Sequence, residues 1–327
     1  MQDLKGKRVL FIGIGFYDYD EHIVTKMQDL GVEVNYYKEY PKLTKLQYLQ
    51  KKLLPKSEKK LIEYYYNNIF ENIKSKIYDY VLVIKGDRVP EWFISKLKDK
   101  YTESQFILYQ WDSIKRLQNF NNIKKYFNNI LTFDRLDSIQ YGYKFRPLFY
   151  KDIYLNNEES SKDYDVFFSG YLHSDRYDVL KKLINNYTKL KIKHHLYIRK
   201  IEFIKEQIKR FTKIGKLYDN SLVNFVSIND FENMEWMRKS KAVLDLHHPQ
   251  QSGLTIRTIE ALAMGNKIIT TNEDIKNYEF YNSTQICVID RNTIEIPFDF
   301  FQTYNYFTSK EKEKYSLEQW VIDVFKL

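Results

Sequence analysis

A turn of small residues that opens an apolar helix pattern is the segment best suited to bind an anion. Ser252 and Gly253 form the turn, the pattern ends at Gly265, and an apolar strand follows. With Ser252 as the helix cap, the backbone amides of Gly253 and Leu254 are left for an anion, and the positive end of the helix dipole points at it. The segment therefore predicts a phosphate-binding turn.

A carboxylate lies inside the same helix pattern. Glu260 is either a solvated residue on the helix surface or a residue that contacts a ligand. It stands between Ile259 and Ala261 in an apolar run, which fits a solvated position less well. It lies one turn beyond Ile256, and Arg257 flanks that face of the helix. Glu260 is therefore a candidate to contact the same ligand as the turn.

A phosphate ligand also needs cations, and four basic side chains stand near turns of the second half. Arg199 and Lys200 follow an expected strand, Arg257 lies in the helix described above, and Arg176 follows the turn at Gly170. Cations placed where negative charge develops are the main catalytic contribution available without a metal. We rank Arg199 and Lys200 first, then Arg257, then Arg176.

The first half of the chain offers acids and a glycine turn. Gly15 follows an apolar run, but the third glycine of a dinucleotide-binding fingerprint is absent. The turn is therefore interpreted as backbone that approaches a substrate, with Asp18 and His22 beside it. Asp112 closes another apolar run and is either a general base or a helix cap.

Apolar runs typical of buried parallel strands alternate with helix patterns and would position all of these residues. The runs are 8–13, 32–36, 80–84, 106–111, 130–133, 164–170, 194–198, 223–226, 243–246, 267–270 and 286–289. A charged helical region spans Lys45 to Lys76, and a closing helical stretch spans Lys310 to Phe325. The alternation predicts an α/β protein with two Rossmann-like domains, whose parallel sheets face a central cleft.

The polar stretch from Asn156 to Asp163 predicts a linker between the two domains. The first domain is expected over residues 1–155 and the second over residues 156–307. Residues 308–327 are expected to pack back on the first domain.

Composition narrows the partners and the compartment. The chain has 327 residues and a formal net charge of +9, which favours anionic partners. Its densest basic run, Lys42 to Lys60, is interpreted either as a solvated helix or as a peripheral contact with the inner membrane. The single cysteine, Cys287, excludes an internal disulfide, and no signal peptide or membrane-spanning run is visible, so a cytoplasmic protein is expected.

The histidine pairs 194–195 and 247–248 are adjacent residues that would point to opposite faces of a strand, so no metal site is expected.

The residues after Ser252 also match a known pattern, which consists of Gly253, Glu260, Ala261, Ala263 and Gly265, followed by an apolar strand at 268–271. This pattern resembles the nucleotide-sugar donor site of glycosyltransferases with the GT-B fold. Upstream runs at 167–171 and 223–245 resemble the elements that precede that site, so the resemblance covers residues 164–271 well. The short sequence segments 109–112 and 145–149 resemble those of CgeB-like and surface-polysaccharide transferases.

The resemblance implies a reaction and a role for each candidate residue. The first domain would bind an acceptor through Gly15, Asp18 and His22. The second domain would bind a nucleotide-diphosphate sugar, a UDP-sugar before others and no further cofactor, through Gly170, Arg176, Ser252, Gly253, Leu254, Arg257 and Glu260. The carboxylate of Glu260 would accept hydrogen bonds from the ribose 2′ and 3′ hydroxyls. Arg199 or Lys200 would neutralise the leaving diphosphate, and Asp112 would be the base if the enzyme inverts.

The sequence departs from the pattern of the class at one position, which leaves the donor sugar and the stereochemical course open. Ser252 stands where the retaining members of the class carry a first glutamate, so neither the donor sugar nor the stereochemical course follows from the sequence. The expected function is glycosyl transfer to a glycan or lipid-linked hydroxyl in surface-polysaccharide synthesis, such as capsule or lipopolysaccharide.

Two alternatives stay open at this point. The first is a teichoic-type polyol-phosphate transferase with a CDP-linked donor, whose chemistry would need His22 or the pair His247 and His248. The second is a non-enzymatic basic scaffold or nucleic-acid module. No basic motif interleaved with aromatic residues supports the latter, so no nucleic-acid partner is expected.

Overall fold

The computed structural model describes residues 4–15, 18–155, 161–302 and 307–326. The first residues of the predicted linker, 156–160, and several side chains of the basic run Lys42–Lys60 lie outside the described residues. Contacts divide the chain into two compact units, here called unit 1 (Met1–Pro147 with Leu317–Leu327) and unit 2 (Leu148–Ser316). The sequence places the corresponding limits at 155 and 308.

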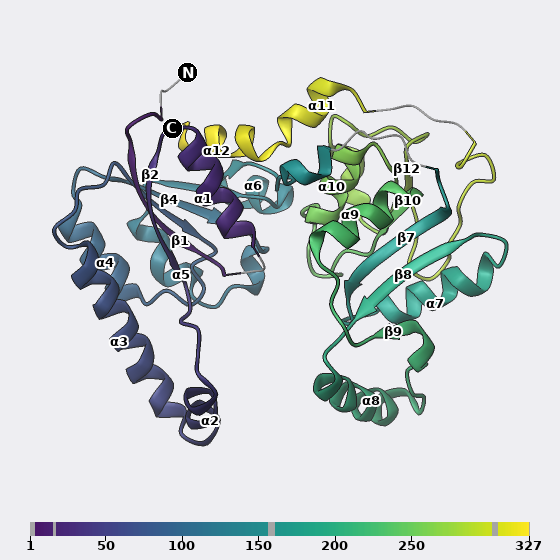
Figure 1. Cartoon of the computed structure of the whole chain (residues 1–327), viewed down its shortest axis with the longest axis horizontal. Coiled ribbons are helices and arrows are strands. Elements are labelled where there is room, and N and C mark those ends of the chain that lie inside the picture. Colours follow the sequence, from purple (N-terminus) through teal and green to yellow (C-terminus); the bar gives the residue numbers. More distant parts are fainter. Residues whose placement is uncertain (1–3, 16–17, 156–160, 303–306, 327) are drawn as a thin grey trace. The chain divides into compact units, whose positions relative to one another are not determined.

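Unit 1 contains a parallel sheet with the strand order β2-β1-β3-β4-β5-β6 (Figure 1). Its strands are β1 (Arg8–Gly13), β2 (Glu33–Lys38), β3 (Tyr80–Ile84), β4 (Gln105–Gln110), β5 (Asn129–Thr132) and β6 (Lys144–Phe145). The two central strands β3 and β4 are almost completely buried, which explains their continuous apolar sequences. The predicted runs gave the first five strands to within two residues, and β6 is an addition.

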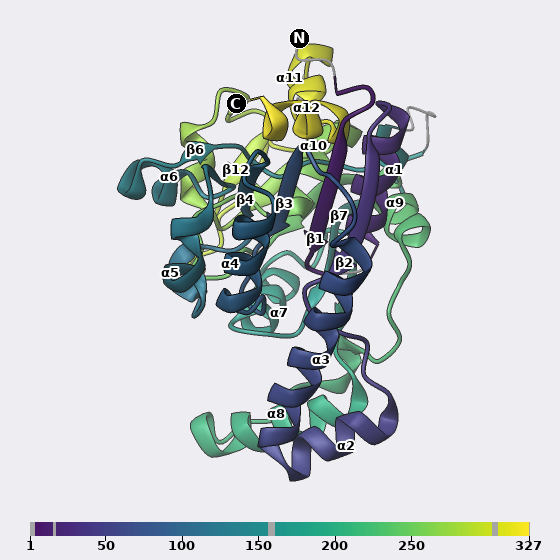
Figure 2. The same ribbon diagram turned by 90° about the vertical axis from the view of Figure 1, so that its left-hand side faces the viewer.

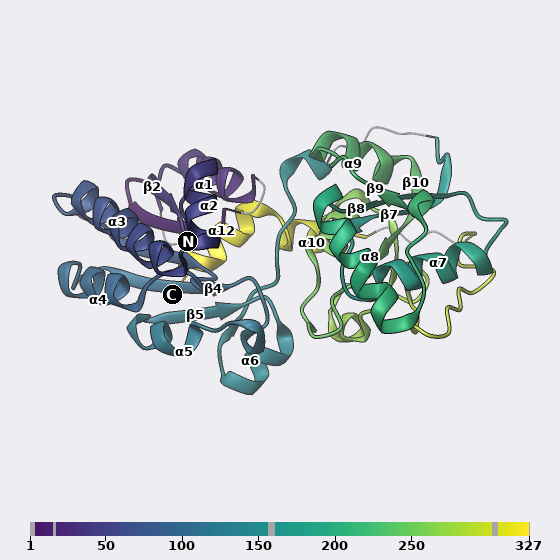
Figure 3. The ribbon, with the colours of Figure 1, turned by 90° about the horizontal axis from the view of Figure 1, so that it is seen from below.

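Helices cover both faces of the unit 1 sheet. Helices α3 (Pro55–Ile73), α4 (Glu91–Lys100) and α5 (Phe120–Ile123) place apolar side chains in one core with β1, β3 and β4. On the other face, Trp320 of α12 (Leu317–Phe325) packs edge to face against Tyr109 with ring centroids 4.9 Å apart, and α1 (Tyr19–Asp29) lies beside α12 (Figure 3). A further helix, α6 (Arg135–Tyr141), connects β5 to β6.

The charged helical region predicted from Lys45 to Lys76 is divided into two helices. It forms α2 (Lys45–Leu53) and α3, which begins at Pro55. Proline has no backbone N–H and is tolerated in the first turn of a helix, so it starts α3 rather than continuing α2. Helix α2 and the first turns of α3 extend beyond the end of the sheet (Figures 1 and 2).

Unit 2 contains a second parallel sheet, with the order β12-β11-β10-β7-β8-β9. Its strands are β7 (Tyr164–Tyr171), β8 (Ile192–Tyr197), β9 (Val223–Asn224), β10 (Ser240–Asp245), β11 (Lys267–Thr270) and β12 (Ile286–Val288). Each corresponds to a predicted run. The expectation of two parallel Rossmann-like sheets is therefore confirmed.

The unit 2 sheet is also covered on both faces. Helices α7 (Arg176–Asn186) and α8 (Lys200–Ile214) share one core with β7, β8 and β10. Helices α9 (Asp230–Arg238) and α10 (Ile256–Met264) contact β10 and β11 on the opposite face. The closing helical stretch is again two helices, α11 (Ser309–Lys314) in unit 2 and α12 in unit 1. Within the described residues, no helix is both long enough and apolar enough to cross a bilayer.

Candidate functional site

The strand order of unit 2 reverses between β7 and β10. These strands are neighbours in the sheet, and the chain runs from β7 to β8 on one side and from β10 to β11 on the other. In open parallel sheets, ligands bind at the carboxyl ends of the strands at such a switch point. Gly170 and Tyr171 end β7 there, and Asp245 ends β10.

Helix α10 begins three residues later than expected, and the prediction that Ser252 caps it is wrong. The cap is Thr255, whose hydroxyl accepts a hydrogen bond from the amide of Thr258. Asp245 selects this start, because its carboxylate accepts hydrogen bonds from the hydroxyls of Thr255 (2.8 Å) and Thr258 (2.7 Å). The carbonyl of Ser252 instead accepts from the side chain of Asn272 at 2.9 Å, so the predicted turn is a loop held against the end of β11.

Glu260 is completely buried, which contradicts its interpretation as a solvated helix residue. Its Oε2 accepts a hydrogen bond from Nη1 of Arg257 at 3.0 Å. The charge of Glu260 also raises the pKa of Tyr154, although burial is the larger cause. Tyr154 lies on the short helical turn η3 (Asp152–Leu155), which packs on α10. The side chain of Asn233 donates to the Tyr154 hydroxyl at 3.0 Å, so the carboxylate lies beside an ordered polar network.

Arg176 is the predicted cation that the fold places at the switch point. Its Nε donates to the carbonyl of Leu246 at 2.8 Å, and its Nη1 donates to that of Tyr171 at 3.3 Å. Burial lowers the pKa of the guanidinium to about 10. Gly170 lets the guanidinium lie close to the backbone, because a Cβ at that position would lie 3.1 Å from Nη1 of Arg176 and displace it slightly.

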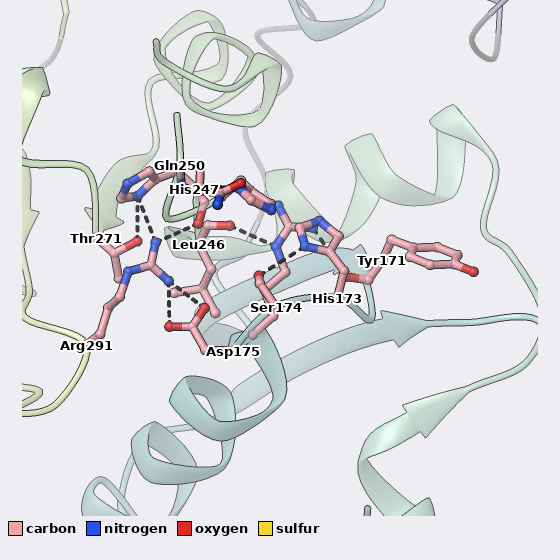
Figure 4. A network of polar contacts seen from close by, with 11 residues as sticks. Tyr171, His173, Ser174, Asp175, Leu246, His247, Gln250, Thr271 and Arg291 are labelled. Carbon is pink, nitrogen blue, oxygen red and sulfur yellow. Dashed lines mark hydrogen bonds and ion pairs between the residues drawn. The ribbon is translucent and has the colours of Figure 1, made fainter. Parts of the chain in front are cut away.

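Arg291, which the sequence interpretation did not select, lies in the same network (Figure 4). Its Nη1 pairs with the two carboxylate oxygens of Asp175 at 2.7 and 2.9 Å, and its Nη2 donates to the carbonyl of His247 at 2.6 Å. It follows β12 by three residues, so its only sequence signal is a basic residue shortly after an apolar run. Basic residues in such positions are common, and Arg291 belongs to no recognised sequence motif.

His247 is held in one protonation state by this network. Its Nδ1 lies 2.8 Å from the hydroxyl of Thr271 and 3.1 Å from Nη2 of Arg291. Because a guanidinium only donates, Nδ1 accepts, and the ring proton of the neutral imidazole is on Nε2. Burial lowers the pKa of His247 to about 4, and the positive charge of Arg291 adds to this effect.

Two further histidines lie at the same edge. The ring of His173 lies 5.6 Å from that of His248, and Ser174 between β7 and α7 has a positive φ of 49° (Figure 4). A non-glycine residue in this conformation is uncommon and is found at functional sites more often than elsewhere. The edge of unit 2 therefore combines two half-buried guanidiniums with imidazoles, a set suited to phosphate oxygens.

The two cations ranked first by sequence occupy a different position. Arg199 caps α8 and Lys200 begins it, and both side chains are exposed. Arg199 pairs with Glu202, which also accepts a hydrogen bond from the hydroxyl of Tyr171. Arg199 is therefore connected to Arg176 only indirectly, because Arg176 donates to the carbonyl of the same Tyr171.

In unit 1, the glycine turn after β1 is occupied by an acid of the protein itself. The amide of Gly15 donates to Oδ2 of Asp20 at 2.6 Å, and the hydroxyl of Tyr36 donates to the same oxygen at 2.7 Å. Gly13 makes room for this carboxylate, since a Cβ there would collide with it. The predicted acceptor residues Asp18 and His22 pair with each other at 3.3 Å on the first turn of α1.

Asp112 lies just beyond β4, at the carboxyl edge of the unit 1 sheet. Its two oxygens pair with Lys85 at 2.8 Å and with Arg116 at 3.4 Å. Lys85 follows β3 with a positive φ of 66°, so this edge also contains a residue in an unfavourable backbone conformation. Each oxygen of Asp112 keeps a further lone pair that an acceptor hydroxyl could donate to, beside the two cations.

A second acid at this edge, Glu39, was not selected from the sequence. It follows β2 directly, its side chain is buried, and its Oε2 lies 3.4 Å from the amide of Arg88. Burial raises the pKa of this carboxyl to about 7, while the charge of Lys85 opposes the shift. The available signal was an acid at the carboxyl end of a predicted strand.

No family model and no curated protein matches this sequence. Solved structures do match along almost the whole chain. An α-glucosyltransferase in complex with UDP and a 13-mer DNA containing a central A:G mismatch is 14% identical and gives a TM-score of 0.59, with 91% of this chain and 90% of that chain covered. Sucrose-phosphate synthase from Thermosynechococcus elongatus is 9% identical, with 97% of both chains covered and a TM-score of 0.60.

HepE from Anabaena in complex with UDP-glucose gives a TM-score of 0.51 at 10% identity, with 98% of this chain and 90% of that chain covered. The resemblance to CgeB-like transferases stays a prediction, since these structures do not address it. At such low identities structural similarity establishes the fold alone. The chain has the GT-B fold, the architecture of the glycosyltransferases that it resembles in structure.

Proposed function

We propose that this protein transfers a glycosyl group from a nucleotide-diphosphate sugar to a hydroxyl of a glycan or lipid-linked acceptor. One observation carries the proposal, namely that Arg176 and Arg291 donate to the neighbouring carbonyls of Leu246 and His247 at the switch point of the unit 2 sheet. Two guanidiniums supply the positive charge and the paired N–H donors that a diphosphate requires, and here they hold a net positive charge beside Asp175 and His247. UDP is the first nucleotide to test, because two structural neighbours were solved with UDP or UDP-glucose.

In this proposal the diphosphate lies against Arg176, Arg291 and the ring of His247. Arg291 already donates to a backbone carbonyl and to Asp175, so its position is set before the ligand arrives. A preorganised cation stabilises the negative charge that develops on the leaving diphosphate and needs no reorganisation during the reaction. Arg199 and Lys200 keep the weaker role of attracting the donor from solution.

Glu260 binds the ribose in the same proposal. Arg257 donates to one of its oxygens, and the carboxylate has no exposed surface. The ribose hydroxyls would therefore replace the guanidinium at that oxygen, which links nucleotide binding to a movement of Arg257. Ser252 and Gly253 then lie in the loop that leads to α10, where a donor sugar would follow the diphosphate.

The acceptor would bind at the carboxyl edge of the unit 1 sheet, near Gly15, Asp18 and His22. Asp112 or Glu39 would receive the proton of the acceptor hydroxyl in an inverting reaction. A role in surface-polysaccharide assembly on the cytoplasmic side of a membrane remains our proposal for the biological setting, by analogy with the class.

A nucleotide panel tests the proposal. The melting temperature is measured with UDP, GDP, CMP, CDP and a short oligonucleotide, since a ligand of the native state stabilises it by about 2.7 kcal/mol at 100 times its Kd. We expect UDP to raise the melting temperature of the wild type. Arg291→Ala should lose the effect, whereas Arg238→Ala should keep it. Arg238 is a matched control because it pairs with Glu235 on α9 at 2.7 Å, outside the network of the switch point.

One observation favours a second candidate, the transfer of a polyol phosphate from a CDP-linked donor. Three histidines, His173, His247 and His248, gather at the same edge, and that chemistry uses a histidine. Stabilisation by CDP and CMP but not by UDP would select this candidate. Stabilisation by the oligonucleotide alone would reject both enzymatic proposals.

A further inference from the structure

Helix α8 carries an apolar stripe that faces solvent. The exposed fractions along it are 74% for Ile201, 60% for Ile204, 61% for Ile208 and 57% for Phe211. These positions follow the spacing i, i+3, i+7 and i+10, which places them on one side of a helix. Leu217, just past the end of α8, is exposed as well, at 59%.

The opposite side of α8 fixes this orientation. Phe203 is buried in the core of unit 2. Arg210 pairs with Asp178 of α7 at 2.6 and 3.0 Å, and its guanidinium lies over the rings of Tyr177 and Tyr218. The helix is therefore attached to unit 2 by one face, and the stripe is turned away from the core by the packing itself. In Figures 1 and 3, α8 lies on the outside of unit 2.

The stripe is surrounded by positive charge. Residues 199–217 contain seven basic residues, Arg199, Lys200, Lys205, Lys209, Arg210, Lys213 and Lys216, and two acidic residues, Glu202 and Glu206. Seven minus two leaves a net charge of +5, which is more than half of the net charge of +9 on the whole chain. Both acids already lie beside a base, Glu202 beside Arg199 and Glu206 beside Lys209.

This combination identifies the partner. A helix with an apolar face, flanking lysines and little net hydrophobicity binds in the interface of a bilayer, with its apolar side chains among the acyl chains and its lysines at anionic headgroups. A second copy of the chain fits less well, because two such helices would bring their lysines together. The stripe is also only about 15 Å long at 1.5 Å per residue, which is short for a stable protein interface.

We propose that α8 docks this protein on an anionic phospholipid surface, with Ile201, Ile204, Ile208 and Phe211 inserted at the headgroup boundary. This surface differs from the run Lys42–Lys60 that the sequence suggested for membrane contact. Docking through α8 does not depend on the reaction proposed above, because none of the four side chains of the stripe belongs to the proposed donor or acceptor site.

Flotation of the full chain with lipid vesicles tests the proposal. The protein is mixed with vesicles of phosphatidylcholine alone, or of phosphatidylcholine with phosphatidylglycerol, and the floated fraction is measured. We expect binding to the mixed vesicles only, with a loss at raised salt. The triple variant Ile204→Ser, Ile208→Ser and Phe211→Ser should reduce the binding constant at least tenfold. The side chains are exposed, so the variant should keep the melting temperature and UDP response of the wild type.

Two matched variants separate the stripe from general surface effects. Ile139→Ser and Phe298→Ser remove exposed apolar side chains elsewhere and should float like the wild type. Tyr48→Ser with Leu53→Ser tests the basic run suggested by the sequence and should also float like the wild type. The proposal is overturned if the triple variant floats normally, or if the Tyr48 and Leu53 variant alone loses binding. It is equally overturned if sedimentation shows a dimer that the triple variant abolishes while the wild type binds no vesicles.

Discussion

Nη1 of Arg257 lies 3.0 Å from Oε2 of Glu260, one turn further along α10, and the carboxylate of Glu260 is completely buried. Most arginine–glutamate pairs at this spacing lie on exposed helix surfaces and contribute little to stability. This pair differs because one partner has no access to water. A buried charge that loses its partner destabilises a protein by about 3–5 kcal/mol.

Replacement of Glu260 by glutamine should therefore affect both stability and nucleotide binding. Glu260→Gln keeps the shape of the side chain but removes the charge that Arg257 neutralises. Arg257, the charge left behind, is partly exposed, so we expect the free energy of unfolding to fall by only about 1–2 kcal/mol. We expect the Kd for UDP to rise at least about tenfold, because the amide is a weaker acceptor for ribose hydroxyls. Urea unfolding and calorimetric titration with UDP measure the two effects.

The matched control is Glu235→Gln. Glu235 and Arg238 have the same i, i+3 spacing on α9, at 2.7 Å, but their side chains are partly exposed. We expect a change in stability of less than about 0.5 kcal/mol and no change in UDP affinity. If folded Glu260→Gln binds UDP as tightly as the wild type, Glu260 does not hold the ribose.

Removal of Arg291 should change both the anion site and the titration of its neighbour. In Arg291→Ala the contacts to Asp175 and to the carbonyl of His247 are lost, so we expect the Kd for UDP to rise at least about tenfold. The pKa of His247 should rise from its value of about 4, since one of the positive charges that lowers it is gone. A pH titration of the His247 imidazole by NMR measures this shift. An unchanged titration would mean that burial alone sets the pKa.

The strands of both sheets and the part of the candidate site on α10 were predictable, because they depend on local sequence patterns. Apolar runs predict buried parallel strands, and Gly265, in the left-handed conformation at φ 71°, ends α10 where a glycine stop was expected. The burial of Glu260 could also be predicted, because apolar residues surround it in the sequence. The start of α10 could not, since Ser252 and Thr255 are both suitable caps and Asp245, ten residues earlier than Thr255, decides between them.

The basic residues of the candidate site show more clearly what local sequence patterns cannot predict. Arg199 and Lys200 follow a strand and were ranked ahead of Arg176, but of these three only Arg176 reaches the carbonyls at the switch point. Arg291 lies more than 100 residues from Asp175, its partner, and no local pattern connects them. Which guanidinium turns toward a site depends on tertiary partners, and these are not visible in a single sequence.

Asp112 and Lys85 allow a test of the proposed base. Asp112→Asn should reduce the turnover of a UDP-sugar at least about 100-fold if the carboxylate accepts the acceptor proton, with the Kd for UDP unchanged. Lys85→Met is the comparison, because it removes the ion pair of 2.8 Å but leaves the carboxylate in place. We expect Lys85→Met to retain more turnover than Asp112→Asn. Equal losses would assign Asp112 a structural role, and near-normal turnover in Asp112→Asn would exclude it as the base.

Glu39 should make the stability of unit 1 depend on pH. Burial raises its pKa from 4.5 to about 7, so between these values the folded protein keeps a proton that the unfolded chain has released. The folded state is therefore favoured below pH 4.5, and this stability is lost as the pH rises through 7. The shift corresponds to roughly 3 kcal/mol. In Glu39→Gln this contribution disappears, so the variant should be more stable than the wild type at pH 8 but not at pH 4.5.

Tryptophan fluorescence during urea unfolding can follow this effect, because Trp92, Trp111 and Trp320 lie in unit 1 and only Trp236 lies in unit 2. Glu33→Gln is the control, since the Glu33 carboxylate is largely exposed and its removal should leave the pH dependence unchanged. Turnover measurements on the same variants test whether the carboxyl of Glu39, with its raised pKa, acts in the reaction. If Glu39→Gln flattens the pH profile of stability and also abolishes turnover while Asp112→Asn does not, Glu39 is the better candidate for the base. If the stability of Glu39→Gln varies with pH as in the wild type, the carboxyl of Glu39 is ionised at neutral pH and its burial does not control its charge.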